Sequence, residues 1–337
     1  MTNPLATPLQ IGGTAIQSRV MLAPMAGVTD VIFRAIVREW ARDSLICTEM
    51  ISSNGLVYSK RWDADILDQS QNDQPIAYQF SASRVEVLTE AAKRIEADHR
   101  PATIDLNMGC PVKKITGNFE GCALMKEPEK AYELISALVK AVETPVTVKF
   151  RLGWDSESMN YVAFGRMCEE AGASMVTLHA RTRAQGYKPG VKWEAFGELK
   201  EALSIPVIAN GDIISLEDAL TVMNTYGVDG VMIGRGALGQ PWLLGQIDRA
   251  LKTGVMPADL TLPEKMEIAW RHAVRLAEYK GEVSGVREMR RHLTDYMKGF
   301  RGASRMRTAI VQVNTLQDVR AILDEVIAGS ETLALAV

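Results

Sequence analysis

Eight short apolar runs recur along the chain, and each is followed by a stretch long enough to form a helix. The runs cover residues 20–24, 45–50, 75–80, 103–108, 145–150, 175–179, 206–210 and 230–234. They are almost continuously apolar, as expected of parallel strands that are buried on both faces. The segments between them, such as 128–142 and 215–226, have helical periodicity. This alternation predicts an α/β fold, and eight repeats of it favour a closed (β/α)8 barrel of the TIM type over an open doubly wound sheet.

Composition removes several classes of protein. Hydrophobic residues make up 47% of the chain, which is enough for a sizeable core, and no stretch approaches the ~18 uninterrupted apolar residues of a membrane span. The net charge of -3 argues against a protein that coats nucleic acid by bulk charge. The first residues lack the basic and apolar regions of a signal peptide, so we expect a cytoplasmic protein. We also expect a monomer, with neither DNA nor a membrane as a partner.

The four cysteines are scattered, without a CxxC pair or a histidine at ligand spacing. This pattern predicts neither a disulfide framework nor a zinc site, and we expect no metal. Cys47 and Cys168 are interpreted as small core residues. Cys110 differs, because a glycine and a proline flank it on a loop directly after the fourth run. A thiol there suits a nucleophile or a general acid, and Cys122, at the start of the following helix, is a second candidate.

Beyond residue 255 the strand pattern stops, and only helical segments follow, over residues 263–281, 285–300, 304–313 and 316–329. We therefore predict a barrel domain at residues 1–254 and a helical domain at 255–337, with a linker at 254–263. Residues 287–307 are strongly basic, with seven basic and two acidic side chains. A solvated helix face usually explains such a run. Because the whole chain has a net negative charge, a phosphate-binding face explains this basic segment equally well.

Polar residues gather at the predicted carboxyl ends of the strands, where barrel enzymes carry their sites. The first run ends in a Pro-Met-Ala-Gly turn, and the others end in hydrogen-bonding side chains or a thiol. These residues are Glu49, Gln79, Asn107 with Cys110, Lys149, His179 with Arg181, Asn210 with Asp212, and Arg235. The aligned ends predict one site at this end of the barrel. After runs seven and eight, the sequences NGD and GRG expose backbone N–H groups that suit a phosphate, and Arg235 adds a charge-assisted pair.

Lys149 ends a buried run, and three explanations of it stay open. The side chain could reach the rim of the barrel, as buried-stem lysines often do. It could act as a Schiff-base nucleophile. It could also place a cation against an electron-rich cofactor ring, and its neighbours Gln79 and His179 are hydrogen-bonding groups suited to the edge of a flavin.

Seven motifs follow one another along the predicted barrel. They are APMAGVTDVIFR (23–34), EMISSN (49–54), DLNMGCPVKKITGNFEGCALM (105–125), VTVKFRLGW (146–154), TLHARTR (177–183), IPVIANGDI (205–213) and DGVMIGRGALGQPW (229–242). In this order they resemble the flavin-dependent tRNA-dihydrouridine synthases, most of all the bacterial B-type branch. The resemblance extends more loosely into the tail through REMRRHLTDYMKGF (287–300). It implies a TIM-type barrel with a helical C-terminal domain, bound FMN, NADPH (or NADH) as the reductant and tRNA as the substrate.

The resemblance also implies roles for individual residues. The flavin would lie along Pro24, Met25 and Ala26, and its ring would meet Gln79 and Lys149. His179 would lie near the phosphate or the edge of the ring. The phosphate would be held by Asn210, Gly211, Asp212, Gly234 and Arg235. Hydride would reach uracil C6 and Cys110 would protonate C5, with Asn107 and Arg181 on the substrate side. In the tail we expect contacts to the RNA backbone from Arg287, Arg290, Arg291 and Arg301. Structured RNA is recognised largely by its shape and its unpaired bases, which suits a D-loop target.

Three other functions fit part of the pattern. A free-pyrimidine oxidoreductase of the dihydroorotate dehydrogenase type would share the phosphate corner and the lysine, but would not need a basic tail. An RNA-binding module without catalysis would need neither Cys110 nor the flavin residues. A Schiff-base aldolase would depend on Lys149.

Overall fold

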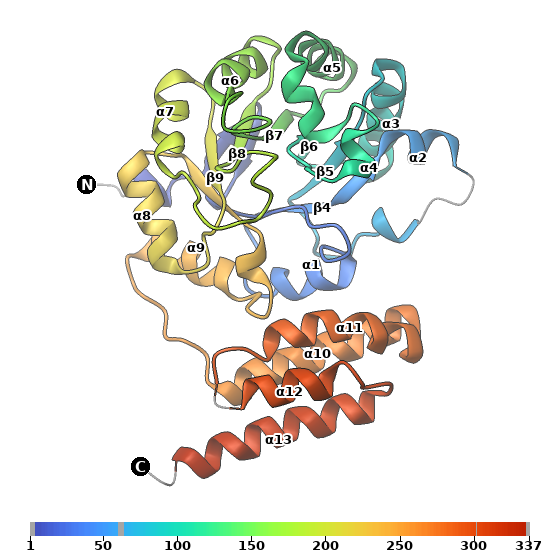
Figure 1. Ribbon diagram of the computed structural model, residues 1–337, viewed down its shortest axis with the longest axis vertical. Helices are drawn as coiled ribbons and strands as arrows, with labels where there is room; N and C mark the ends of the chain where they lie inside the picture. Colours follow the sequence, from blue (N-terminus) through green and yellow to red (C-terminus); the bar gives the residue numbers. More distant parts are fainter. Residues whose placement is uncertain (1–3, 60–63, 301, 335–337) are drawn as a thin grey trace.

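The computed structural model describes residues 4–59, 64–300 and 302–334. Its eight parallel strands close into a barrel in the order β10-β3-β4-β5-β6-β7-β8-β9 (Figure 1). The strands are β3 (Val20–Leu22), β4 (Leu45–Ser52), β5 (Ile76–Ser81), β6 (Thr103–Met108), β7 (Val146–Arg151), β8 (Met175–His179), β9 (Val207–Asn210) and β10 (Gly230–Ile233). Each lies on one of the eight predicted runs. Closure is direct, because Met232 of β10 pairs with Met21 on one side and Asn210 on the other. The open-sheet alternative is therefore wrong.

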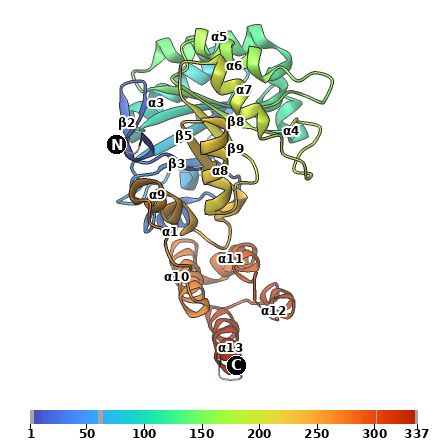
Figure 2. The same cartoon turned by 90° about the vertical axis from the view of Figure 1, so that its left-hand side faces the viewer.

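Helices follow the strands and cover the outside of the barrel (Figures 1 and 2). They are α1 (Val31–Arg38), α2 (Ser53–Tyr58), α3 (Val85–His99), α4 (Lys113–Thr116), α5 (Pro128–Ala141), α6 (Tyr161–Glu170), α7 (Glu194–Ala202), α8 (Leu216–Tyr226) and α9 (Leu243–Thr253), with short 3-10 turns η1 (Pro4–Ala6), η2 (Ala64–Ile66), η3 (Gly121–Lys126) and η4 (Arg235–Ala237). Local sequence explains where several begin. Pro128 occupies the first position of α5, where its missing N–H costs nothing. Ser215 and Asp218 form a reciprocal capping box at the start of α8.

A hairpin that the sequence analysis did not predict precedes the barrel. Its strands, β1 (Leu9–Ile11) and β2 (Thr14–Ile16), pair in antiparallel fashion around a Gly-Gly turn. A Cβ on Gly12 would lie 3.0 Å from Ser174 Oγ, just before β8 begins, so the turn packs against the amino ends of the strands. Leu9, Ile11 and Ile16 are buried with residues from inside the barrel. The hairpin thus covers the end of the barrel opposite to the predicted site.

In the described part of the chain after the barrel, the structure has four helices, as the sequence predicted: α10 (Leu262–Lys280), α11 (Glu282–Tyr296), α12 (Ala303–Ile310) and α13 (Leu316–Ala334). They lie together beside α1 and form their own apolar core, which includes Leu276, Leu293 and Leu323 (Figures 1 and 2). Two residues of the barrel part, Ile36 and Trp242, belong to that same core. The helices are therefore packed against the barrel through apolar contact as well as through the connecting segment.

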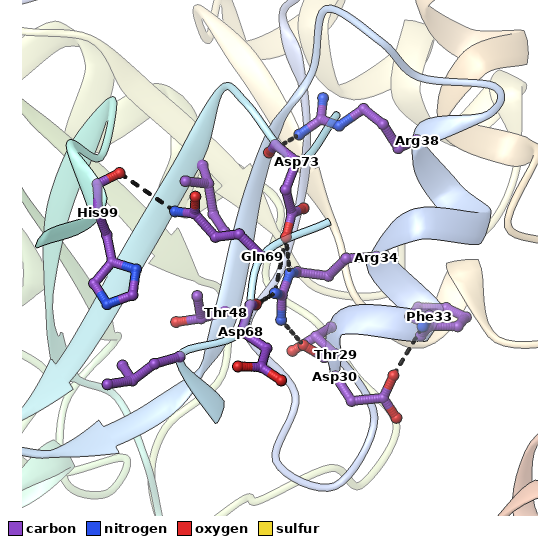
Figure 3. Close-up of polar contacts among 12 residues, drawn as sticks. Thr29, Asp30, Phe33, Arg34, Arg38, Thr48, Asp68, Gln69, Asp73 and His99 are labelled. Atoms are coloured by element: carbon purple, nitrogen blue, oxygen red, sulfur yellow. Dashed lines mark hydrogen bonds and ion pairs between the residues drawn. The ribbon is translucent and has the colours of Figure 1, made fainter. Parts of the chain in front are cut away.

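Two buried arginines of α1 hold the loop that leads into β5 (Figure 3). Arg34 donates to Asp73 Oδ2 from Nε at 3.1 Å and from Nη2 at 2.8 Å, and its Nη1 donates to the Thr29 carbonyl at 2.8 Å. Arg38 donates to the Asp73 carbonyl at 2.8 Å. The side chain of Asp68, in the same loop, accepts a hydrogen bond from Tyr279 of α10. The loop is therefore fixed from both the barrel and the C-terminal helices.

Candidate active site

A pocket of about 410 Å³ opens at the carboxyl ends of the strands, within the range usual for small-ligand sites. Every residue predicted for the cofactor lines it: Pro24, Met25, Ala26, Gln79, Lys149, His179, Asn210, Gly211, Asp212, Gly234 and Arg235. So do four residues predicted for chemistry or substrate: Asn107, Cys110, Arg181 and Arg291. Side chains from all parts of the barrel therefore meet in one cavity.

The pocket has a cationic interior around a neutral histidine. His179 is buried, and its pKa is held well below the ordinary value by desolvation and then by the charges of Lys149, Arg151, Arg181 and Arg235. The imidazole is consequently uncharged at neutral pH. Among the described residues that line the pocket, Asp212 alone is acidic. This excess of positive charge suits an anionic ligand such as a phosphate.

Lys149 points into the pocket rather than to the rim. Its Nζ donates to Asn210 Oδ1 at 2.8 Å, and the Asn210 amide is itself oriented because its Nδ2 donates to the Met232 carbonyl at 2.8 Å. Burial, reinforced by the nearby charge of Arg151, lowers the pKa of Lys149 to about 8. The rim explanation is therefore wrong. The geometry is compatible both with a cation against a cofactor and with a nucleophilic amine.

The phosphate corner differs in detail from the expectation for Asp212. Its carboxylate is paired with the guanidinium groups of Arg181 and Arg235, the latter at 2.5 Å. A carboxylate repels a phosphate, so only the backbone of Asp212 suits one. Gly211, at φ +126°, fits the corner because a Cβ there would lie 3.0 Å from the His179 ring. Backbone N–H groups near Gly211 and Gly234, together with Arg235, are the groups suited to hold a phosphate.

Cys110 stands on the loop after β6 with a half-buried thiol. Burial raises its pKa above the ordinary value, while the Val112 backbone and the charge of Arg151 act in the opposite direction. The group is therefore a protonated thiol at neutral pH, which favours a proton donor over a standing nucleophile. Cys122 is fully buried behind the loop, where its backbone N–H donates to the Cys110 carbonyl at 3.1 Å. It does not line the pocket. Cys47 and Cys168 are core residues, as predicted.

Comparison with known proteins identifies the family. Residues 21–331 match the family model described as "Dihydrouridine synthase (Dus)". The chain belongs to the dihydrouridine synthase family. It is 42% identical over 326 residues to a probable tRNA-dihydrouridine synthase 1 of Synechocystis, covering 97% of this chain and 91% of that protein. It is 38% identical over 313 residues to tRNA-dihydrouridine synthase B of Pseudomonas aeruginosa, covering 93% of each.

Solved structures of lower identity share the fold. An old yellow enzyme homologue from Zymomonas mobilis superposes with a TM-score of 0.54 at 12% identity, covering 77% of this chain and 95% of that one. Histamine dehydrogenase from Rhizobium sp. 4-9 gives a TM-score of 0.56 at 15% identity, over 78% of this chain and 51% of that one. Within the described residues, no helix is long and apolar enough to cross a membrane. The same residues contain no cluster of three or more histidine, cysteine or acidic side chains that could hold a metal.

Two polar side chains that line the pocket, those of Arg151 and Tyr187, were not predicted by the sequence analysis. Arg151 is two positions after Lys149 on β7, so both side chains point to the same face of the strand. Its Nε donates to the Gly109 carbonyl at 2.7 Å, next to the thiol loop. Tyr187 has an exposed ring that faces the guanidinium groups of Arg151 at 5.4 Å and Arg235 at 5.1 Å. Arg151 could have been predicted from its position two residues after Lys149 on the same strand. Tyr187 lies in a loop, where no sequence pattern singles it out.

The basic tail divides into residues in different environments. Arg291 of α11 lines the pocket and donates to the Gly27 carbonyl at 3.0 Å. Arg290 is half-buried, and its Nε donates to the Val313 carbonyl at 2.8 Å, which ties α11 to the segment between α12 and α13. Arg287 is exposed on α11. Arg301 lies outside the described residues. The basic residues of the segment 287–307 therefore do not form one continuous surface.

Arg181 is also held by internal contacts. The side chain is 1% exposed, its Nε donates to the Lys188 carbonyl at 2.8 Å, and its Nη1 donates to Asp212 Oδ1 at 3.1 Å. It shapes the wall of the pocket and fixes the loop that contains Lys188.

Proposed function

We propose that this protein reduces uridine to 5,6-dihydrouridine in tRNA, at a D-loop site, with FMN as its bound cofactor and NADPH as the reductant. The observation that carries the proposal is the meeting of a protonated thiol, Cys110, with a cationic, phosphate-suited corner in one pocket. Membership of the dihydrouridine synthase family and the names of the relatives support it.

The pocket fits FMN in its chemistry. The glycines at 211 and 234 leave room for close approach of a phosphate, and Arg235 supplies a guanidinium beside them. Gln79 and Lys149 contribute an amide and an ammonium to the lining of the cavity, in which a flavin ring would lie along residues 24–26. When bound, the flavin would accept a hydride from NADPH and pass it to uracil C6, which leaves C5 to be protonated.

The residues of the chain would handle the substrate and the proton. The target uridine must leave the base stack, because stacking hides the C5=C6 bond. Asn107 and Arg151 stand beside the thiol loop, where they would orient the uracil. Cys110 Sγ would hold the proton that C5 receives, and its raised pKa keeps that proton in place until the base arrives.

An anaerobic absorbance experiment tests this function. The purified protein should show a flavin band that bleaches with NADPH and returns when unmodified tRNA is added. The same tRNA already carrying dihydrouridine is the control and should leave the band bleached. A flavin that NADPH reduces but tRNA does not reoxidise would point to a free pyrimidine as substrate. A colourless protein without flavin affinity would favour the RNA-binding module.

The helical domain, residues 255–337, is proposed to bind the tRNA backbone. Log affinity for tRNA should then fall linearly with log salt concentration, since each neutralised phosphate releases counterions. Arg287→Ala removes an exposed charge of α11 and is expected to reduce the slope by about 1. The measurement is a filter-binding or fluorescence titration at several salt concentrations.

Two variants make that titration specific. Arg94→Ala changes an exposed arginine on α3, an outer helix of the barrel, and should leave the slope unchanged. Arg290→Ala breaks the bond to the Val313 carbonyl and should lower the stability of the helices as well. An unaltered slope for Arg287→Ala would mean that this side chain only solvates the surface.

A further inference from the structure

A buried carboxylate lies beneath the pocket, at the start of a chain of hydrogen bonds. Asp105 of β6 is 3% exposed and accepts two bonds, from Thr147 Oγ1 at 2.5 Å and from Gln79 Nε2 at 2.7 Å. The barrel register explains the meeting, because Asp105 is the cross-strand partner of Gln79 on β5 and of Thr147 on β7. Three adjacent strands therefore place these side chains in one layer.

The chain of bonds continues from Gln79 to the thiol loop. Gln79 is 1% exposed, and its Oε1 accepts from Asn107 Nδ2 at 2.7 Å. Asn107 Oδ1 in turn accepts from the backbone N–H groups of Gly109 at 3.1 Å and Cys110 at 2.9 Å. Asn107 lies two residues after Asp105 and therefore on the same face of β6. It connects the layer of side chains around the carboxylate to the turn that carries the thiol.

The direction of this chain is fixed at both ends, by the carboxylate of Asp105 and by the backbone N–H groups of the thiol loop, which can only donate. An ionised carboxylate only accepts hydrogen bonds, whereas each amide side chain has one accepting and one donating end. Asp105 therefore obliges Gln79 to present its NH2 group, which leaves the Gln79 oxygen to face Asn107. Asn107 must then present its own NH2 group, and its oxygen is left to face the loop. Burial raises the pKa of Asp105, although the donors Thr147 and Gln79 and the nearby ammonium of Lys149 act in the opposite direction. The orientation of Gln79 follows from the geometry, since its Nε2 faces Asp105 Oδ2 at 2.7 Å.

We propose that Asp105 is a positioning residue that fixes the orientations of the Gln79 and Asn107 amides and, through them, the turn that presents Cys110. Only the role of Cys110 as the proton donor rests on the proposed function. The positioning itself is a property of the folded chain, with or without a substrate.

Removing the acceptor frees the first amide of the chain. In Asp105→Leu, an apolar side chain of similar size replaces the carboxylate, so the NH2 group of Gln79 loses its acceptor. Gln79 is then no longer fixed in one orientation, and it holds Asn107 less firmly. The thiol loop keeps its bonds to Asn107, but that side chain is no longer held from below, so the anchoring of the loop weakens.

The amide variant Asp105→Asn keeps the acceptor. The hydroxyl of Thr147 can accept a hydrogen bond as well as donate one, so the new NH2 group can donate to Thr147 Oγ1. The new oxygen then still accepts from Gln79, and Asn107 again turns its oxygen toward the loop. This variant removes the carboxylate but keeps the hydrogen bond to Gln79, so it separates the positioning bond from the general effect of losing a buried carboxylate.

The test is the rate at which iodoacetamide alkylates Cys110, followed by mass spectrometry of the peptide. The other three cysteines are buried, so the half-buried Cys110 is the reactive thiol to follow. The limiting rate at high pH, where the thiol is fully ionised, separates accessibility from a change in pKa. All samples are compared at equal flavin content and below the onset of thermal unfolding.

We expect Asp105→Leu to raise the limiting rate about tenfold, because Gln79 and Asn107 lose the acceptor that holds them. Asp105→Asn should react at the wild-type rate. Thr147→Val is the matched control: it removes a bond to the same carboxylate but leaves the bond to Gln79, so the rate should not change. If Asp105→Leu does not fold, Asp105→Ala, which also lacks an acceptor for Gln79, takes its place with the same expected result.

A folded Asp105→Leu that reacts at the wild-type rate would overturn the positioning role, as would an Asp105→Asn variant that reacts as fast as Asp105→Leu. Neither result depends on flavin reduction or tRNA. A protein that lacked uridine reduction would therefore fail the spectroscopic experiment while the alkylation series still reported on the loop.

Discussion

Cys110→Ala is expected to lower the turnover of uridine reduction by a factor of about 10²–10⁴, which is the usual contribution of a positioned general acid. Protonation at carbon requires such an acid, and the half-buried thiol holds its proton because burial raises its pKa. Flavin content and tRNA affinity should stay close to wild type, because the phosphate corner and the basic residues of α11 are untouched. The measurement is single-turnover dihydrouridine formation beside separate flavin and tRNA titrations.

Cys168→Ala is the matched control for that result. Cys168 is completely buried in the core of the barrel part, away from the pocket lining, so its removal should lower stability without lowering single-turnover activity in the folded protein. Near-normal turnover by Cys110→Ala would show that another group protonates the base. Loss of flavin together with activity would instead make Cys110 part of the cofactor site.

The barrel was predictable because its physical demands appear directly in the sequence. Parallel strands covered on both faces are largely apolar, so each strand from Val20 to Ile233 coincides with an almost continuously apolar run. The hairpin formed by β1 and β2 was not predicted, because strands of three residues are too short to show the alternation of apolar and polar residues. Its signal was the Gly-Gly pair between them, which suits a two-residue hairpin turn.

The candidate pocket was predictable to the extent that strand ends define it. Residues such as Gln79, Lys149 and Asn210 follow from topology, since a closed parallel barrel brings all carboxyl ends together. Hydrogen-bond partners do not follow in this way. Asp212 was expected beside a phosphate, yet its side chain pairs with Arg181 and Arg235, which lie on other strands' loops. The partner of Arg290, likewise, depends on how the last helices fold back.

Arg34→Ala is expected to destabilise the folded protein by about 3–5 kcal/mol, the usual effect of removing one partner of a buried ion pair. Arg34 is 0% exposed and Asp73 is 1% exposed, so the carboxylate would be left in the interior without its counter-charge. The Thr29 carbonyl would lose its donor as well (Figure 3). The free energy of unfolding is measured by urea titration with intrinsic fluorescence, if the transition is two-state.

Arg94→Ala is the matched control, because it breaks an exposed ion pair with the same 2.8 Å separation. Arg94 pairs with Glu90 on α3, but the two side chains are 46% and 49% exposed, so water solvates the charge that is left behind. Arg94→Ala should therefore cost at most about 0.5 kcal/mol. Equal losses for the two variants would mean that Asp73 reaches water or another cation once Arg34 is gone. The loop before β5 would then be adaptable, and its contact with Tyr279 would not depend on α1.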